Sequence, residues 1–350
     1  MTKTFTNLLL WIAVSMLAVS CDKNDSDQPE IDHPSNNEKI VYVAGYRNVA
    51  GVRTAMLWKN GTPIFLTNGT HNSEAHSIYV DGDDVYVAGY AVFGLTQVAV
   101  VWKNGTILPL SHDSSEAYAV FVHSGTVYAA GIVDRKAAYW AGIENQTHIR
   151  LSNNNGSCAY GIFANDQNVF IAGTTGGNQP AVWKKEGQAI SITTEGADKI
   201  SSVFVVGSDV YAGGGSTKNK KFVATYWKNN QPYQLTDGTR TQHVYNESVV
   251  NSMYVRGNDT YAAGSLIIKP AKEIATVWKN NDGEIQLTAS SDEPAVAHSI
   301  FVSNNNTLYV SGYHRFNKTN RVATLWVDGE PTYLTDPDTN SEAYAVFVKE

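Results

Sequence analysis

The stretch Ser341-Glu-Ala-Tyr-Ala-Val-Phe-Val-Lys-Glu350 decides the fold. The same pattern opens two earlier stretches, Ser73-Glu-Ala-His-Ser-Ile-Tyr-Val80 and Ser115-Glu-Ala-Tyr-Ala-Val-Phe-Val122. In both of these the chain continues into a second apolar run, whereas the last stretch has no such continuation. The last ten residues therefore look like the first strand of a repeat unit whose other strands lie elsewhere in the sequence.

The sequence contains seven copies of a repeat that is about 40–50 residues long, a length typical of propeller blades. A Val-Tyr-Val-Ala-Gly motif, or a close variant, ends in each copy at Gly45, Gly89, Gly131, Gly173, Gly214, Gly264 and Gly312. One tryptophan follows each motif, at Trp58, Trp102, Trp140, Trp183, Trp227, Trp278 and Trp326.

The second repeat shows the strand pattern of one unit. Its four short apolar runs are His76–Val80, Val85–Tyr90, Val98–Lys103 and Ile107–Leu110. An Asp-Gly-Asp-Asp turn separates the first two runs, and Asn104-Gly105 between the last two is typical of a type I′ hairpin. The runs are rich in Val, Tyr, Ile and Trp, and no segment has the pattern of an amphipathic helix. We therefore predict an all-β, seven-bladed β-propeller with four antiparallel strands per blade.

The first repeat begins at Lys39-Ile40-Val41-Tyr42, which corresponds to the second strand of the pattern. We predict that Ser341–Val348 supplies its missing first strand. The C-terminal strand then closes the ring and covers two sheet edges that would otherwise be exposed.

Several units resemble the HAF-type repeats of bacterial extracellular proteins. The resemblance is carried by Ala55-Met-Leu-Trp58, Ala275-Thr-Val-Trp278 and Ala323-Thr-Leu-Trp326, followed by Leu-Thr and then by Ser-Glu-Ala. It spans Lys39 to Glu350, but Val-Ala-Thr or a similar triplet stands where that family has His-Ala-Phe. The resemblance implies a secreted protein with a propeller-like fold and names no functional residues.

The N-terminal segment predicts export. Its apolar run from Leu8 to Val19 is about half as long as a bilayer span, which is typical of a signal peptide. Ala18-Val-Ser-Cys21 resembles the lipobox of bacterial lipoproteins, although Leu is usual where Ala18 stands. That resemblance implies a signal peptide over residues 1–20 and an acylated Cys21 that anchors the protein in a lipid bilayer. An ordinary signal peptide cut nearby is the alternative.

Residues 21–38 are acidic and polar, so we expect a flexible tether before the propeller domain at 39–350. Acidic residues soon after the cysteine also resemble the surface-export signal of some Gram-negative lipoproteins, which favours the cell surface of the outer membrane. Cys158 is the only other cysteine, so no internal disulfide is expected.

The strand order distinguishes the two rims of the ring. Turns between strands 1 and 2, and between strands 3 and 4, are tight and share one rim. Connections from strand 2 to 3, and from each blade to the next, are longer and share the other rim, which we call the long-loop rim. Because binding residues concentrate on variable loops set on a rigid scaffold, we expect ligands at the long-loop rim.

The loops between strands 2 and 3 are basic, although the protein has a net charge of −7. Their cations are Arg47, Arg53, Arg135, Lys136, Lys218, Lys220, Lys221, Lys269, Lys272, Arg315, Lys318 and Arg321. Such a local excess attracts anionic polymers, and we single out Arg315, Lys318 and Arg321 as ligand-binding candidates. Simple solvation of long loops is the alternative explanation. No nucleic acid is expected as a partner at the cell surface.

The first residues of the innermost strands should ring the channel mouth. In blade order these collar residues are Tyr344, His76, Tyr118, Tyr160, Ser201, Asn251 and His298. Glu342, Glu74 and Glu116 stand two positions before the first three of them, followed by Cys158, Lys199, Val249 and Val296. The candidate ligand-binding residues at the mouth are His76, Tyr118, His298, Tyr344, Glu74, Glu116 and Glu342.

A His/Tyr/Glu collar has groups for acid–base catalysis, and paired carboxylates suit glycoside hydrolysis. Two histidines are too few for a catalytic zinc site, so neither a metal nor a cofactor is expected. The alternative is that Ser-Glu-Ala-Tyr/His is a repeat consensus that packs the blades together. One Trp per blade likewise indicates inter-blade core rather than sugar stacking, and Cys158 reads as a small buried residue rather than a nucleophile.

From these patterns we predict a lipid-anchored binding module for a glycan, a surface polymer or an envelope protein. The alternative is a polysaccharide lyase or hydrolase that acts on acidic glycans, with His76, His298 or Tyr344 moving a proton. A third possibility is an assembly partner in a larger envelope complex. No catalytic residue is identified by the sequence.

Overall fold

The computed structural model describes residues 39–177, 179–184, 188–190, 197–218, 221–236, 247–268, 272–281, 283–288, 293–316 and 320–350. These belong to one compact unit, Glu38–Glu350. The predicted signal peptide, Cys21 and the tether lie outside the described residues, as do the loop cations Lys220, Lys269 and Lys318.

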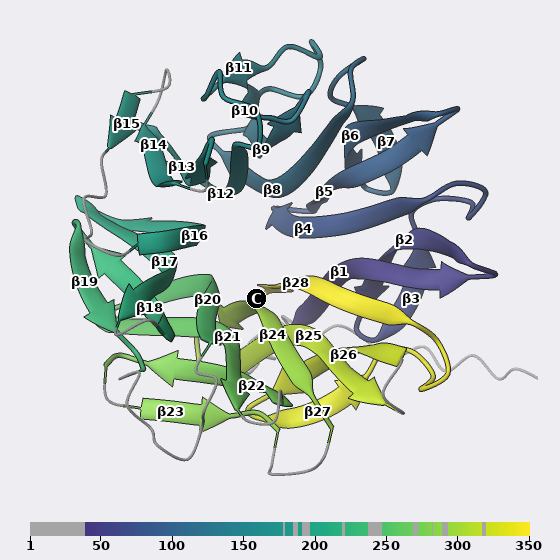
Figure 1. The fold of residues 1–350 in the computed structure, drawn as a ribbon. Coiled ribbons are helices and arrows are strands. Elements are labelled where there is room, and N and C mark those ends of the chain that lie inside the picture. The colour runs from purple at the N-terminus through teal and green to yellow at the C-terminus, as the bar shows by residue number, and fades with distance from the viewer. Residues whose placement is uncertain are drawn as a thin grey trace, which may run out of the picture. The chain divides into compact units, whose positions relative to one another are not determined.

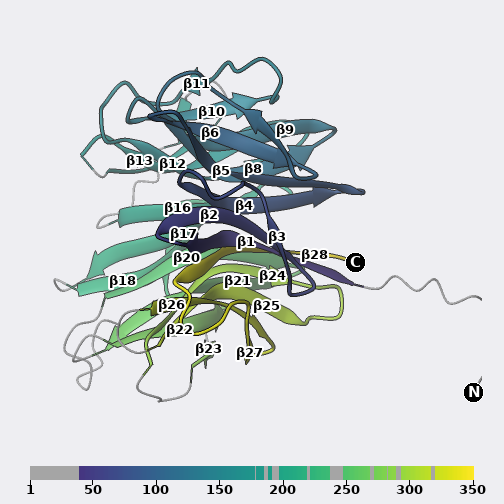
Figure 2. The same cartoon turned by 90° about the vertical axis from the view of Figure 1, so that its right-hand side faces the viewer.

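The described chain is all β-structure and forms seven blades of four antiparallel strands in a ring, as predicted (Figures 1 and 2). Inner strands of successive blades contact one another all the way around. The sheets of blades 5 and 6 are joined by a single parallel pair, Phe222 with Glu247.

Each blade has an inner strand beside the channel, two middle strands and an outer strand. In this order, blade 1 contains β28 (Ser341–Lys349), β1 (Ile40–Val49), β2 (Val52–Lys59) and β3 (Thr62–Phe65). Blade 2 contains β4 (Ser73–Asp81), β5 (Asp84–Phe93), β6 (Thr96–Lys103) and β7 (Thr106–Pro109). Blade 3 contains β8 (Ser115–His123), β9 (Thr126–Val133), β10 (Lys136–Ala141) and β11 (Ile149–Arg150).

The other four blades follow the same plan. Blade 4 contains β12 (Cys158–Ala164), β13 (Val169–Thr175), β14 (Gln179–Lys184) and β15 (Gln188–Ile190). Blade 5 contains β16 (Ala197–Val206), β17 (Asp209–Lys218), β18 (Lys221–Lys228) and β19 (Gln231–Gln234). Blade 6 contains β20 (Glu247–Arg256), β21 (Asp259–Ile268), β22 (Lys272–Lys279) and β23 (Gly283–Gln286). Blade 7 contains β24 (Ala295–Val302), β25 (Leu308–Phe316), β26 (Asn320–Val327) and β27 (Glu330–Tyr333).

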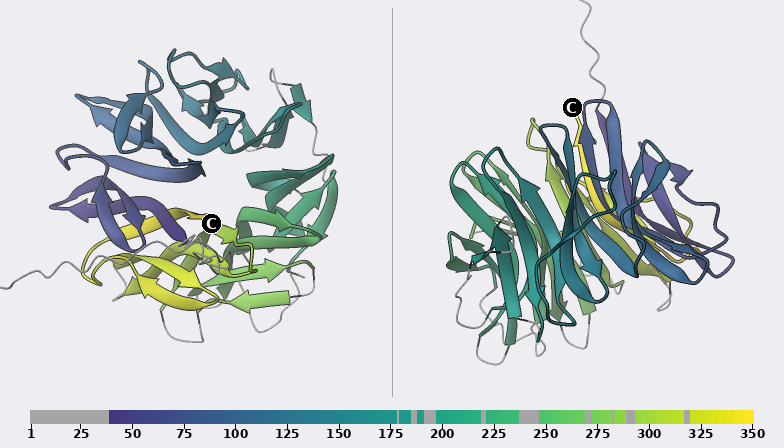
Figure 3. Two further views of the ribbon diagram at one scale, coloured as in Figure 1. Left: turned by 180° about the vertical axis from the view of Figure 1, so that it is seen from behind. Right: turned by 90° about the horizontal axis from the view of Figure 1, so that it is seen from above.

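The C-terminal strand closes the ring. β28 pairs with β1 along its length, so the yellow end of the chain lies beside its purple start (Figures 1 and 3). It also joins blade 1 to blade 7, because the Ala323 backbone N–H donates to Ser341 Oγ at 2.9 Å. Val346 and Val348 of β28 pack into one apolar cluster with Leu325 of β26. The predicted closure is confirmed.

Every inner strand carries a β-bulge near its start. The register shifts in all seven blades at the position predicted for the collar, for example between Ala75 and Ser77 around His76. The bulge presses a backbone carbonyl against the neighbouring strand, where a Cβ on Gly89 would overlap the Glu74 carbonyl. The same overlap exists at the last glycine of the Val-Tyr-Val-Ala-Gly motif in every blade. The motif therefore ends in glycine because the bulge leaves no room for a side chain.

The apolar core lies between the blades rather than at the axis. One cluster of buried side chains fills each of the seven interfaces between neighbouring blades. All seven repeat tryptophans are buried in these clusters, which confirms their assignment as inter-blade core. Cys158 is buried and has a free thiol.

The turns also match the sequence pattern. Asn104 and Gly105 both have positive φ, at 50° and 81°, as a type I′ hairpin requires. Asn104 Oδ1 accepts a hydrogen bond from the Val85 backbone N–H at 2.8 Å, which ties the turn to the second strand. In the described residues, no helix is long and apolar enough to cross a membrane.

The close approach at the bulge predicts that Gly89→Ala destabilises the propeller by about 1–3 kcal/mol, because the new methyl group overlaps the Glu74 carbonyl. Gly283→Ala is the matched control, since a Cβ there lies 3.6 Å from its nearest neighbour, Lys279 O, and its effect should stay within about 0.5 kcal/mol. Urea unfolding of both variants measures this. Equal stability of the two variants would contradict the steric account of the motif.

Candidate functional site

The bulges turn one side chain per blade toward the channel mouth, and five of these carry rings that touch in series. The centroids are 5.3 Å apart from His298 to Tyr344, 5.1 Å from Tyr344 to His76, 5.5 Å from His76 to Tyr118 and 5.6 Å from Tyr118 to Tyr160. We call this run the ring arc. Its members are partly exposed. The structure thus brings together His298, Tyr344, His76 and Tyr118 as predicted.

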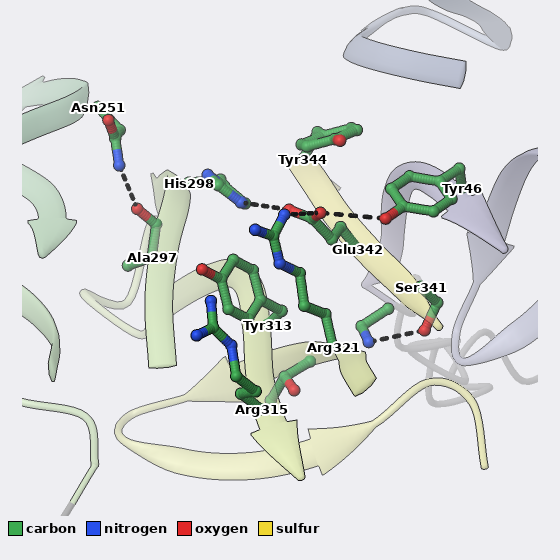
Figure 4. A network of polar contacts seen from close by, with 12 residues as sticks. Tyr46, Asn251, Ala297, His298, Tyr313, Arg315, Arg321, Ser341, Glu342 and Tyr344 are labelled. Carbon is green, nitrogen blue, oxygen red and sulfur yellow. Dashed lines mark hydrogen bonds and ion pairs between the residues drawn. The ribbon is translucent and has the colours of Figure 1, made fainter. Parts of the chain in front are cut away.

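Glu342 lies beside the start of the arc and is almost fully buried, with 3% of its surface exposed. It accepts hydrogen bonds from Tyr46 Oη at 3.1 Å and from Arg321 Nη1, and His298 Nε2 lies 3.2 Å from its Oε2 (Figure 4). Both carboxylate oxygens are therefore occupied by protein groups.

Glu74 repeats this arrangement in the next blade. It is 4% exposed and accepts from Tyr90 Oη at 3.0 Å, from Tyr344 Oη at 3.1 Å and from Arg53 Nη1 at 2.5 Å. Glu116 in blade 3 lies 2.8 Å from His76 Nε2 and accepts from Gln97 Nε2 at 2.9 Å.

These contacts follow the same pattern at three successive interfaces between blades. The collar residue of one blade reaches the carboxylate of the next, from His298 to Glu342, from Tyr344 to Glu74 and from His76 to Glu116. The third strand of the earlier blade adds a second donor to each carboxylate, namely Arg321, Arg53 and Gln97 in turn. The carboxylates therefore join adjacent blades and also fix the rings that they contact.

Burial determines which of these groups hold protons. Burial, together with the Glu342 and Glu74 carboxylates, raises the pKa of the Tyr344 phenol well above its usual value. Burial and Glu116 do the same to the pKa of Tyr118. Both phenols are therefore hydrogen-bond donors at neutral pH and not general bases.

Burial alone would raise the pKa of Glu342, but hydrogen bonds and charges from His298 and Arg321 outweigh it and lower that pKa. Glu342 is therefore a carboxylate near neutral pH and is poorly suited to act as a general acid. Proton transfer by His76 or His298 in a lyase or hydrolase stays a prediction.

Two of the three predicted loop cations have acidic partners. Arg321 pairs with Glu342, and Arg315 Nη2 lies 3.4 Å from Glu273 Oε2. Arg53, which the sequence placed among the same basic loops, pairs with Glu74. Lys318 lies outside the described residues. The positive charge of these loops is thus partly neutralised by the carboxylates beside it.

A second ring of aromatic side chains was not predicted. One lies three residues after each collar residue, and together they are Tyr79, Phe121, Phe163, Phe204, Tyr254, Phe301 and Phe347. Each contacts both neighbours, with centroids 4.7–5.3 Å apart, so an apolar belt runs around the inner strands beneath the collar. The signal in the sequence was the aromatic residue in every copy of Ser-Ile-Tyr-Val and its variants.

In blades 5 and 6 the collar side chains are smaller and are not aromatic. Ser201 and Asn251 occupy the collar positions of blades 5 and 6, and Asn251 Nδ2 donates to the Ala297 carbonyl at 2.9 Å (Figure 4). Cys158 and Lys199 occupy the positions that hold carboxylates in blades 1 to 3. The collar is therefore asymmetric in both size and charge.

Two grooves in the described part of the chain are lined by residues other than the collar residues. A groove of about 340 Å³ on the long-loop rim is lined by residues that include Leu66, His71 and Phe93. A second groove, of about 610 Å³, lies between blades 2 and 3 next to Lys103 and Glu144. No group of three or more His, Cys, Asp or Glu side chains suited to a metal ion occurs in the described part of the chain.

Comparison with known proteins supports the fold alone. No protein-family model and no curated protein matches the sequence. Among solved structures, one described as a putative 6-phosphogluconolactonase from Bacteroides fragilis is 11% identical with a TM-score of 0.51, covering 91% of this chain and 100% of that one. The computationally designed Ika8 protein is 14% identical with a TM-score of 0.45, covering 80% of this chain and 92% of that one.

The ion pairs of Glu342 predict a pH-dependent effect of Glu342→Gln. Because the folded-state pKa of Glu342 is lowered, its charged form stabilises the fold above the unfolded-state pKa of about 4, and this contribution is lost as the pH falls further. At pH 7 the substitution should cost about 1–3 kcal/mol, toward the lower end because Arg321 is 42% exposed. Thermal unfolding from pH 7 to pH 3 should show the difference from the native protein shrinking.

The matched control is Glu330→Gln on the outer strand β27, where the carboxylate is exposed. It should leave stability within about 0.5 kcal/mol of the native protein at every pH. A constant difference for Glu342→Gln across the pH range would contradict the assigned role of its charge.

Proposed function

We propose that this propeller is an envelope-anchored binding module that recognises a glycan at its collar. The observation that carries this proposal is the ring arc, which is partly exposed at the channel mouth and held in place by buried carboxylates. Aromatic rings pack against the apolar faces of sugars, and phenols and imidazoles hydrogen-bond to hydroxyl groups. A set of rings already fixed in position loses little conformational entropy on binding.

The strand order also shows where the chain enters the propeller relative to the collar. Lys39 Nζ lies 3.1 Å from Glu350 Oε1, and the Glu350 carboxylate accepts from the Asn304 backbone N–H at 2.8 Å. Asn304 belongs to the turn between the first two strands of blade 7, so the chain enters the propeller at the tight-turn rim. The collar lies near the starts of the inner strands, which are at the long-loop rim. The entry point of the chain and the collar therefore lie at opposite rims of the propeller domain.

Anchoring through an acylated Cys21, a location at the outer membrane surface, and a glycan or envelope protein as partner are parts of the same proposal. The resemblance of Ala18-Val-Ser-Cys21 to a lipobox supports the anchor. Because Arg53, Arg315 and Arg321 already pair with carboxylates, we expect the ligand to contact the ring arc rather than the loop cations.

The function predicts that the full-length chain binds glycans on an array of neutral and acidic oligosaccharides. Tyr160→Ala should weaken that binding about tenfold, because it removes one ring from the end of the arc. Tyr333→Ala on the outer strand β27 is the control and should bind as the native protein does. The measurement is array binding at low and moderate salt, followed by calorimetric titration of the best ligand.

Absence of binding to every glycan would refute the proposed function. It would also be refuted if Tyr160→Ala, shown to be folded by circular dichroism, bound as tightly as the native chain.

The anchor makes a separate prediction. Cys21→Ala should move the protein from the membrane fraction to the soluble fraction and abolish incorporation of radiolabelled palmitate, because the acylated thiol is lost. Cys158→Ala, which alters the buried cysteine instead, should leave both unchanged. Labelling of Cys21→Ala at the native level would exclude acylation at this position.

A further inference from the structure

The carboxylate position of the collar is occupied by a lysine in one blade. Glu342, Glu74 and Glu116 stand two residues before the collar residue in blades 1, 2 and 3, and Lys199 stands at the same position in blade 5. In a ring of seven, blade 5 lies across the channel from blades 1 and 2. The collar therefore has carboxylates on one side and an ammonium group on the other.

The carboxylates do not neutralise Lys199. Each already has donors from its own or the preceding blade, including Arg321 for Glu342 and Arg53 for Glu74. Lys199 itself makes no hydrogen bond or ion pair with any residue in the described part of the chain. Its acidic neighbour in sequence, Asp198, is exposed and accepts a hydrogen bond from Thr217 Oγ1 instead.

Cys158, which occupies the same position in blade 4, lies close enough to Lys199 to interact with it electrostatically. Burial raises the pKa of the Cys158 thiol to about 11, so the thiol is uncharged at neutral pH and supplies no counterion. Burial lowers the pKa of the Lys199 ammonium group. This cation has thus lost part of its hydration without gaining a partner among the described residues.

Such a cation differs from those on the loops. An exposed lysine or arginine interacts weakly with a ligand charge because water and salt screen it. A partly desolvated ammonium group with no counterion interacts more strongly with an incoming anion, since the cost of removing its water has already been met by the fold. The Ser201 hydroxyl, two residues farther on, is also buried without a hydrogen-bond partner in the described residues.

We propose that Lys199 binds the oxyanion of an acidic sugar, a carboxylate or sulfate group, whose ring contacts the arc at Tyr160 and Tyr118. This inference rests on the proposed function and narrows its ligand class to acidic glycans. It places the charge recognition inside the collar, at a position that holds a glutamate in three other blades, and not on the loop arginines.

The test uses the full-length chain with glucuronate, inorganic sulfate and glucose as probes, titrated by calorimetry and by ¹³C NMR of dimethylated lysines. In the native protein, glucuronate should bind and shift the Lys199 signal, and glucose should leave that signal in place. Lys199→Met should weaken glucuronate binding at least tenfold, and Lys199→Glu should abolish it. Lys199→Arg should remain within about threefold of the native protein. Sulfate binding that exceeds glucuronate binding would identify a sulfated sugar as the ligand class.

Lys59→Met is the matched control, since it removes the same charge from an exposed residue on the tight-turn rim. It should bind glucuronate as the native protein does. Equal affinity of Lys199→Met and the native protein, or no binding of either anion to the native protein, would overturn the inference. In either case the proposed function would still stand if neutral glycans bind and Tyr160→Ala weakens them.

Discussion

The architecture of the collar depends on one backbone feature, the β-bulge near the start of each inner strand. The extra residue interrupts the hydrogen-bond ladder at one place and turns a side chain toward the channel mouth. In a regular strand, strict alternation would place that side chain on a face of the sheet instead. The same bulge presses a carbonyl against the second strand and excludes any side chain there, so the repeat glycine and the collar residue are two consequences of one constraint. Seven repetitions of this bulge produce a ring of side chains at the mouth.

The buried carboxylates show why a structural and a binding interpretation of the collar need not exclude each other. A buried carboxylate without partners would cost several kcal/mol, and each of Glu342 and Glu74 is instead satisfied by an arginine and by two groups from tyrosine or histidine. Four of these bonds, from His298, Arg321, Tyr344 and Arg53, cross between blades and so support the ring. The bonds to Glu342 and Glu74 also hold His298 and Tyr344 in fixed positions, and Glu116 does the same for His76, which is what a binding surface requires.

Much of the fold followed from the sequence because its signals are local and periodic. Asn104-Gly105 determines a hairpin turn within four residues, and the spacing of glycine and tryptophan gives the number of blades. The first repeat lacks a first strand, which identifies it as the partner of Ser341–Val348. The collar positions followed from the same alignment of repeats. The aromatic belt could have been found in the same way, since Tyr79 and its six counterparts recur at one position in every repeat.

The pairing of the charged side chains could not be predicted from the sequence, because their partners come from other blades. In the sequence Arg53 and Arg321 belong to basic loops, and only the tertiary structure shows that each extends to a carboxylate about twenty residues farther on, in the following blade. Lys199 could be recognised from sequence as a change at a repeat position, but only the packing of neighbouring strands shows that it has no partner among the described residues. The sequence by itself determined the number of blades, their strands and the closure of the ring, since hydrogen-bonded turns and hydrophobic alternation act over a few residues. Only the tertiary structure decided which charges remain available, because that depends on side chains brought together across the interfaces between blades.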